Sequence, residues 1–166
     1  MLPEGLLAGL RASRPPADLP AEALARLDPV LAGRLFPRPL VPAAVLVALM
    51  PASNGWEILL TRRTEHLRDH PGQISFPGGR LLGADESPLA AALREAEEEV
   101  GLDPRFVDVL GYLPPHTVVT GFAVSPVVAV LRPGYVLRPD PGEVAGIFGL
   151  PVTHLLATDS FTTGER

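Results

Sequence analysis

Apolar residues recur at intervals of three and four between residues 88 and 100, which is the spacing of a helix with one buried face. Ser87 is suited to cap this helix, Pro88 fits its first turn, and Gly101 stands where a helix-ending glycine belongs. The pattern therefore predicts one amphipathic helix between Ser87 and Gly101. Its apolar stripe consists of Leu89, Ala92, Leu93, Ala96 and Val100.

Longer apolar runs elsewhere in the chain predict strands rather than helices. Asn54 and Gly55 form a strong hairpin signal between the first two runs, and Pro114 and Pro115 interrupt the later pair. The pattern of runs and breaks predicts several strands around the central helix. The expected strands cover residues 41–50, 56–61, 105–113 and 122–132.

Both ends of the sequence are expected to contain helices. Residues 1–40 are rich in proline and alanine and are expected to form an N-terminal helical extension, with one helix over residues 21–35. A turn at 133–134 and a loop at 139–142 separate the last strand from a short helix expected over residues 152–157. The apolar side of the first helix would consist of Leu24, Leu27, Leu31 and Leu35.

Composition and charge narrow the class of protein. The 166 residues are enough for a single domain with its own core, and the absence of cysteine excludes disulfides and thiol chemistry. A net charge of −5 argues against general nucleic-acid binding. The longest apolar run, residues 40–50, is too short to cross a membrane, and the N-terminus lacks the pattern of a secretory signal. We therefore expect a cytoplasmic protein without a nucleic-acid or membrane partner.

Three carboxylates share one face of the predicted helix. At about 100° per residue, Glu95, Glu98 and Glu99 lie within roughly 100° of one another, away from the apolar stripe, while Glu97 points to one edge. The alternative is a solvated acidic face, but such a face would interleave more bases than Arg94, because like charges three or four positions apart repel. An oxygen-only ligand set of this kind favours Mg²⁺ or Mn²⁺.

The spacing of residues around this helix resembles the Nudix box, G-x5-E-x7-R-E-U-x-E-E-x-G-U, in which U is a large apolar residue. The gap between Gly79 and Glu86 is one residue longer than in the common box, and Ala96 is small for the U position. The resemblance implies an α/β fold, the Nudix-type α/β/α sandwich with a mixed sheet. Within residues 78–102 the matching positions are Gly79, Glu86, Arg94, Glu95, Glu98, Glu99, Gly101 and Leu102.

The preceding segment, residues 59–79, resembles the signature L-L-T-x-R-[SA]-x3-R-x3-G-x3-F-P-G-G of the coenzyme A pyrophosphatase branch of the Nudix family. Thr64 stands where the signature has Ser or Ala, and the remaining positions agree. The longer gap in the box, with Asp85 within it, is also similar to that branch. The whole resemblance covers roughly residues 40–157.

The candidate catalytic residues are Glu98, Glu95 and Arg94. One carboxylate is expected to accept a proton from the attacking water, and Glu98 or Glu95 is a better candidate than Glu86. Glu95, Glu98 and Glu99 are the candidate metal ligands. Arg94 is expected to hold the carboxylates in place; its alternative is an ordinary surface arginine.

A basic stretch in this acidic chain supplies candidates for substrate binding. Arg63 and Arg68 are expected to contact phosphates, including the 3′-phosphate of coenzyme A, with a solvated loop as the alternative. Arg62 is a weaker candidate. Gly78 and Gly79 allow the backbone to come close to a ligand or to adopt a positive φ.

A few further residues could belong to the site. Glu143 is a candidate remote carboxylate, because Nudix enzymes often bring one from a late loop, although the resembled branch tends to carry a glutamate where this chain has Gly146. His66 and His70 are four positions apart, but an oxygen-rich site disfavours them as a metal pair. His116 is expected to form a hydrogen bond in a loop rather than to act in catalysis.

The resemblance implies metal-dependent hydrolysis of coenzyme A or its thioesters to 3′,5′-ADP and a 4′-phosphopantetheine. The alternatives are a Nudix hydrolase of ADP-ribose or another nucleoside diphosphate derivative, and a non-catalytic nucleotide-sensing module. The resembled branch usually carries a further C-terminal strand and helix, which residues 1–166 do not supply. The oligomeric state stays open, a homodimer included.

Overall fold

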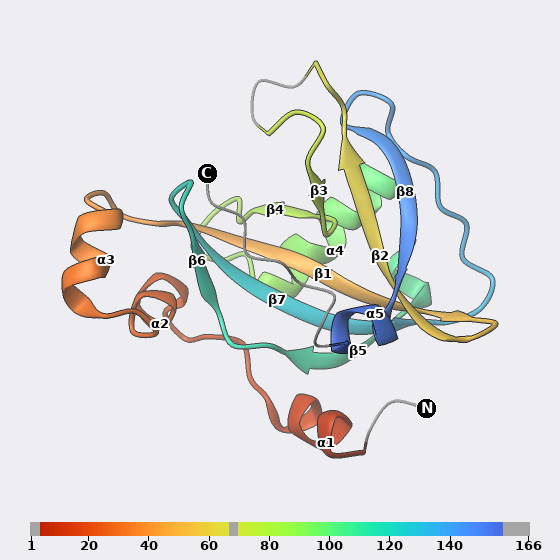
Figure 1. Cartoon of the computed structure of the whole chain (residues 1–166), viewed down its shortest axis with the longest axis horizontal. Helices are drawn as coiled ribbons and strands as arrows, with labels where there is room; N and C mark the ends of the chain where they lie inside the picture. Colours follow the sequence, from red (N-terminus) through yellow and green to blue (C-terminus); the bar gives the residue numbers. More distant parts are fainter. Residues whose placement is uncertain (1–3, 67–69, 158–166) are drawn as a thin grey trace.

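The mixed sheet of the computed structural model runs through the described part of the chain, residues 4–66 and 70–157 (Figure 1). The main path of pairing is β3-β2-β1-β7-β5, while β4 pairs with β1, β6 with β7 and β8 with β2. The strands are β1 (Val41–Ala52), β2 (Gly55–Arg63), β3 (Ile74–Ser75), β4 (Gly78–Arg80), β5 (Val107–Tyr112), β6 (His116–Val118), β7 (Phe122–Leu131) and β8 (Val144–Pro151).

Strand β1 organises this sheet because three strands pair with it. Its residues 41–49 pair in parallel with residues 122–130 of β7. Along its other edge, residues 49–52 pair with β2 and residues 43–45 pair with β4, both antiparallel. Strand β2 turns away from β1 beyond the hairpin and pairs instead with β8 and β3. The short strand β4 therefore lies next to the first half of β1, within reach of the helix at residues 88–100.

Helices cover both faces of the sheet. Helix α4 (Pro88–Val100) packs on one face, where its alanines and Val100 meet alternate residues of β1 and β7 in the main core. Helices α1 (Glu4–Ala12) and α5 (Val152–Leu156) pack on the opposite face, against the intervening β1 residues Val47 and Leu49. In Figure 1, α4 lies behind the strands and α5 in front of them. The expected α/β/α sandwich with a mixed sheet is confirmed.

Helix α4 begins and ends where the sequence predicted. The side chain of Ser87 accepts a hydrogen bond from Ala90 N, and Pro88 occupies the first helical position. Gly101 ends the helix in the left-handed conformation, at φ 65°, and its N–H donates to carbonyls of the last turn. These caps fix the register of the helix and so the direction of its glutamates.

The single helix expected over residues 21–35 is wrong. The structure has two helices, α2 (Leu19–Leu24) and α3 (Pro29–Leu35), separated at Asp28. Asp28 precedes a proline, which disfavours helical backbone, and it adopts φ −57° and ψ 131°. Its carboxylate caps α3 by accepting from Val30 N and Leu31 N. No helix in the described ranges is long and apolar enough to span a membrane.

The four strands expected from sequence are confirmed, as are the hairpin at Asn54-Gly55 and the short helix α5. Four further strands of the described residues were not expected from the sequence. Strands β3, β4 and β6 have two or three residues each, too few for a periodic pattern. Strand β8 contains Gly146 and Gly149, which weaken the strand signal, and it follows a proline-rich loop.

Candidate active site

Two glycines allow strand β4 to fit between β1 and α4. A Cβ on Gly78 would collide with the carbonyl oxygen of Ala44 in β1, and a Cβ on Gly79 would collide with the carboxylate of Glu95 in α4. The Gly78 N–H donates to Glu99 Oε2 at 3.2 Å. These residues therefore bring the backbone of β4 into direct contact with the glutamates. Their predicted role in binding substrate stays a prediction.

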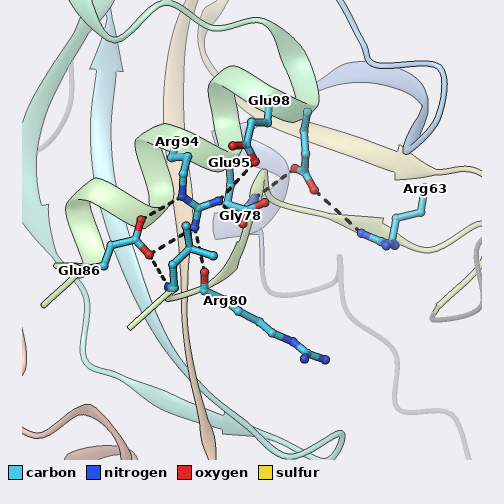
Figure 2. Close-up of polar contacts among 9 residues, drawn as sticks. Arg63, Gly78, Arg80, Glu86, Arg94, Glu95 and Glu98 are labelled. Carbon is cyan, nitrogen blue, oxygen red and sulfur yellow. Dashed lines mark hydrogen bonds and ion pairs between the residues drawn. The ribbon is translucent and has the colours of Figure 1, made fainter. Parts of the chain in front are cut away.

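Arg94 connects the beginning of α4 to its glutamates (Figure 2). Its Nε donates to Glu86 Oε1 at 2.9 Å, and its Nη1 donates to Glu95 Oε1 at 2.7 Å and to Glu98 Oε2 at 3.3 Å. Its Nη2 donates to the carbonyl oxygen of Arg80 in β4 at 3.0 Å. The guanidinium thus joins three carboxylates and one main-chain carbonyl, which is the positioning role expected for Arg94.

Glu86 completes the loop that precedes α4. Its Oε2 accepts from Leu82 N at 2.6 Å, and its carboxylate also receives two N–H groups from Arg94. The hydrogen bonds from Arg94 and then from Leu82 hold the pKa of Glu86 below its ordinary value. Glu86 is therefore an ionised anchor for Arg94, and this environment agrees with the preference for Glu98 or Glu95 as proton acceptor.

Glu99 is the buried member of the set, with only 4% of its surface exposed. Burial raises its pKa to about 7; the hydrogen bond from Gly78 opposes this, while the charges of Glu95 and Glu143 add to it. Arg63 Nη1 lies 3.9 Å from Glu99 Oε1 and offsets only part of the effect. The positive charge near Glu99 is therefore too small to keep the pKa of this carboxylate at its ordinary value.

The two other helix glutamates are more accessible. The side chain of Glu98 is 60% exposed, and its contact is the long hydrogen bond from Arg94. The side chain of Glu95 is 18% exposed, between Arg94 and Gly79. The expected common face of Glu95, Glu98 and Glu99 is present, but burial divides it into one exposed, one intermediate and one buried carboxylate.

A cavity of about 720 Å³ adjoins this cluster, at the face of β4 and β1 opposite α4. Arg63 links the two regions, because it lines the cavity and also contacts Glu99. Its Nε is buried and has no hydrogen-bond partner among residues 4–66 and 70–157. The other lining residues include Val41, Ala43, Val45, His70, Gln73, Phe76, Gly78, Gly79, Arg80 and Phe122.

Comparison with known proteins identifies the family of this chain. The family model of the NUDIX domain matches residues 40–164, well over half of the chain. The chain belongs to the Nudix family. A relative described as "Uncharacterized Nudix hydrolase NudL", from Enterobacter sp. (strain 638), is 46% identical over 114 residues, which are 69% of this chain and 59% of that protein. NudL of Salmonella paratyphi B is 48% identical with the same coverage, so the chain spans 59% of the length of these relatives.

Solved structures show the same Nudix fold. A Nudix hydrolase from M. smegmatis, RenU, aligns with a TM-score of 0.58 at 21% identity, over 70% of this chain and 73% of that one. The NUDIX domain of Shewanella oneidensis NrtR, complexed with ADP ribose, aligns with a TM-score of 0.52 at 21% identity, over 82% and 85% of the two chains. At these identities the likeness concerns the fold alone.

The carboxylates of this site are the ligand type that divalent cations prefer, although their side chains do not converge on one point. Among the residues that the structure describes, no three acidic or histidine side chains converge closely enough to hold a metal ion. Glu95 and Glu98 turn toward Arg94 instead. The raised pKa of the buried Glu99, increased by Glu95 and Glu143, nevertheless marks an all-oxygen site that added positive charge would stabilise. The metal-ligand assignments stay predictions.

The late loop that contains Glu143 lies close to the helix glutamates. The carbonyl oxygen of Glu143 accepts from Thr64 N at 3.0 Å, and its carboxylate is close enough to raise the pKa of Glu99. Gly146 lies in β8 opposite Arg62, so the departure from the branch pattern falls on a paired strand. Glu143 remains the candidate remote carboxylate.

The three candidate histidines lie in different surroundings. His66 Nε2 lies 3.1 Å from the carbonyl oxygen of Gly142, whereas His70 lines the cavity. His116 begins β6 instead of lying in a loop, and burial together with the charge of Arg26 lowers its pKa. Arg68 lies outside the described residues. Arg80 also lines the cavity, and its position after the two glycines carries no signal of its own in the sequence.

Gly79 offers a test of how closely β4 must approach Glu95. In Gly79→Ala the added methyl group would displace the Glu95 carboxylate, a flexible end, so we expect a small loss of stability but a drop of about 10- to 100-fold in Mn²⁺ affinity or turnover. Calorimetric titration and turnover would measure this. Gly83→Ala is the matched control, because a Cβ at Gly83 meets open space. Equal effects of both substitutions would contradict the assignment of Glu95 as a metal ligand that β4 holds in place.

Proposed function

We propose that the chain is a metal-dependent pyrophosphohydrolase that cleaves the diphosphate linkage of coenzyme A or its thioesters. One observation carries the activity: Arg94 holds Glu86, Glu95 and Glu98 around β4, next to the buried Glu99 and a cavity of about 720 Å³. A non-catalytic nucleotide-sensing module would not need this ordered set of carboxylates. A hydrolase does, because it must neutralise a diphosphate and accept a proton.

The ligands for Mg²⁺ or Mn²⁺ would be Glu95, Glu98 and Glu99, with Glu143 as the remote candidate. A bound ion supplies positive charge that neutralises the diphosphate and makes an attacking water more acidic. Glu99 is the ligand of this set whose orientation is fixed, because it is buried and accepts from the Gly78 N–H. Arg94 sets the separation of Glu95 from Glu98 through a single nitrogen, Nη1.

The chain's own residues divide the steps of hydrolysis. Glu98, the most exposed glutamate of the set, accepts the proton of a water that attacks one phosphorus of the diphosphate. The bridging P–O bond breaks, and the leaving phosphate keeps the bridging oxygen. Arg63 donates from its guanidinium to a phosphate oxygen at the point where the cavity meets Glu99. The products are 3′,5′-ADP and 4′-phosphopantetheine or its acyl thioester.

Substrate choice rests on the segment that leads into β4. Residues 59–79 carry the signature of the coenzyme A branch, and its arginine at position 63 reaches both Glu99 and the cavity. ADP-ribose is the alternative substrate, because the Shewanella oneidensis NrtR domain of the same fold is complexed with ADP ribose. The two substrates differ in the group on the second phosphate, pantetheine or ribose, and in the 3′-phosphate, which only coenzyme A carries.

A substrate panel tests the proposal. With Mg²⁺ or Mn²⁺, we expect kcat/KM for coenzyme A to exceed that for 3′-dephospho-coenzyme A and for ADP-ribose. One charge-assisted contact to the 3′-phosphate is worth about 1.5–3 kcal/mol, or roughly 10- to 150-fold. Faster cleavage of ADP-ribose would favour the alternative hydrolase. Nucleotide binding without turnover of any compound would favour the sensing module.

A further inference from the structure

Arg80 takes part in two regions through two different groups. Its carbonyl oxygen accepts from Arg94 Nη2, whereas its side chain extends away from the carboxylates (Figure 2). The side chain lines the 720 Å³ cavity on the other side of β4. Gly79 faces Glu95, and side chains alternate along a strand, so its neighbour Arg80 must face away from α4.

The strand register explains where the guanidinium lies. Arg80 pairs with Ala43 of β1, and the adjacent β1 residue on that face, Val41, pairs with Phe122 of β7. The methyl group of Ala43 leaves room for the long arginine side chain to cross β1. Its Cζ lies 5.2 Å from the centre of the Phe122 ring, a cation–π contact.

The guanidinium of Arg80 forms no ion pair within the described residues. Within residues 4–66 and 70–157, its guanidinium has the Phe122 ring as a neighbour but no carboxylate and no hydrogen-bond acceptor. Arg63, which also lines the cavity, faces Glu99 instead. The same stacking occurs at Arg105 on Phe106, 5.0 Å from the ring centre, but Arg105 is paired with Asp103 and lies outside the cavity.

We propose that Arg80, stacked on Phe122, is an anion-binding subsite that recognises a phosphate of the substrate other than the scissile diphosphate. Stacking occupies the face of a guanidinium and leaves the N–H groups at its edge free for two parallel hydrogen bonds to a phosphate. The surrounding wall of Val41, Val118 and Phe122 is apolar and offers no competing charge. In the proposed function, on which this inference rests, the phosphate is the 3′-phosphate of coenzyme A.

The placement separates two tasks along the cavity. Arg63 lies beside Glu99, where the proposed function places cleavage of the diphosphate, and Arg80 lies beside Phe122 on β7. A substrate that carries a further phosphate besides the diphosphate would contact both arginines. A substrate without it would leave the Arg80 guanidinium without a partner and would lose the binding energy of that contact.

Steady-state kinetics on two substrates test the subsite. Arg80→Gln should lower kcat/KM for coenzyme A by about 10- to 150-fold, mainly through KM, and should leave 3′-dephospho-coenzyme A unchanged within error. Arg80→Lys should retain part of the preference, since lysine keeps the charge but not the planar pair of donors. Phe122→Leu should weaken the same preference because the stacking platform is gone. Arg105→Gln, the matched control, should change neither substrate.

Binding without turnover gives a second measurement. In metal-free calorimetry, the wild type should bind 3′,5′-ADP more tightly than 5′-AMP, and Arg80→Gln should remove the difference. Equal losses on both substrates, or an unchanged preference for the 3′-phosphate in Arg80→Gln, would overturn the subsite. Failure of the wild type to hydrolyse coenzyme A would instead overturn the proposed function, while the two nucleotides would still decide the role of Arg80.

Discussion

Replacement of Glu98 by glutamine is expected to abolish most hydrolysis and to leave the fold intact. The side chain is 60% exposed and its contact is a 3.3 Å hydrogen bond from Arg94, so little packing depends on its charge. Loss of a positioned proton acceptor costs about 10²- to 10⁴-fold in rate. Turnover of coenzyme A at saturating Mn²⁺, together with a thermal melt, would measure both quantities.

Glu97→Gln is the matched control for this experiment. It removes one carboxylate from the same helix, but Glu97 is exposed and lies outside the Arg94 cluster. We expect near-normal turnover from it. A folded Glu98→Gln protein with near-normal turnover would remove Glu98 from the mechanism and leave Glu95 as the proton acceptor to be tested.

The sequence was sufficient for helix α4 and for the identity of its acidic face. Its period, its Ser87 cap and its Gly101 end are local features, and each agrees with the structure because they reinforce one another. The expected helix over residues 21–35 failed for an equally local reason. Its leucines keep the helical period, but Asp28 and Pro29 favour the start of a new helix.

The differences among the three glutamates could not be predicted from the helix alone. Glu98 and Glu99 are adjacent in sequence, yet one is largely exposed and the other buried. The difference arises from β4, whose Gly78 N–H meets Glu99 and which reaches α4 through pairing with β1. A three-residue strand has no periodic signal, so its contacts become visible only in the fold.

Arg80 shows the same limit in another form. Its proposed role depends on a register that aligns it with Ala43 and places Phe122 opposite Val41, two pairs along on the neighbouring strand. These three residues come from separate parts of the chain, and no short motif contains them. Sequence patterns located the candidate residues for the proposed hydrolysis, whereas long-range pairing determines which side chains line the rest of the cavity.

Glu99 should make the metal-free protein less stable as the pH rises, and Glu99→Gln should remove this dependence. Burial raises the pKa of Glu99 from its ordinary 4.5 to about 7, so between these values the folded state binds more protons than the unfolded state. The free energy of unfolding therefore falls as the pH rises through this interval. This loss of unfolding free energy is at most about 3 kcal/mol. Above pH 7, Glu99→Gln should be the more stable protein in EDTA, because glutamine keeps an acceptor for Gly78 N–H without a buried charge.

A divalent cation should reverse that order. Metal that binds only the folded state raises its stability by RT ln(1 + [L]/Kd), about 2.7 kcal/mol at 100 times Kd, and Glu99→Gln should gain much less. Urea denaturation at about pH 5 and about pH 8, with EDTA or with Mn²⁺, would show both effects. The Glu97→Gln control should follow the wild type in each condition, because its carboxylate is exposed. If Glu99→Gln and the wild type instead gain equal stability from Mn²⁺, Glu99 is not a metal ligand, and the acidic face of α4 needs another explanation.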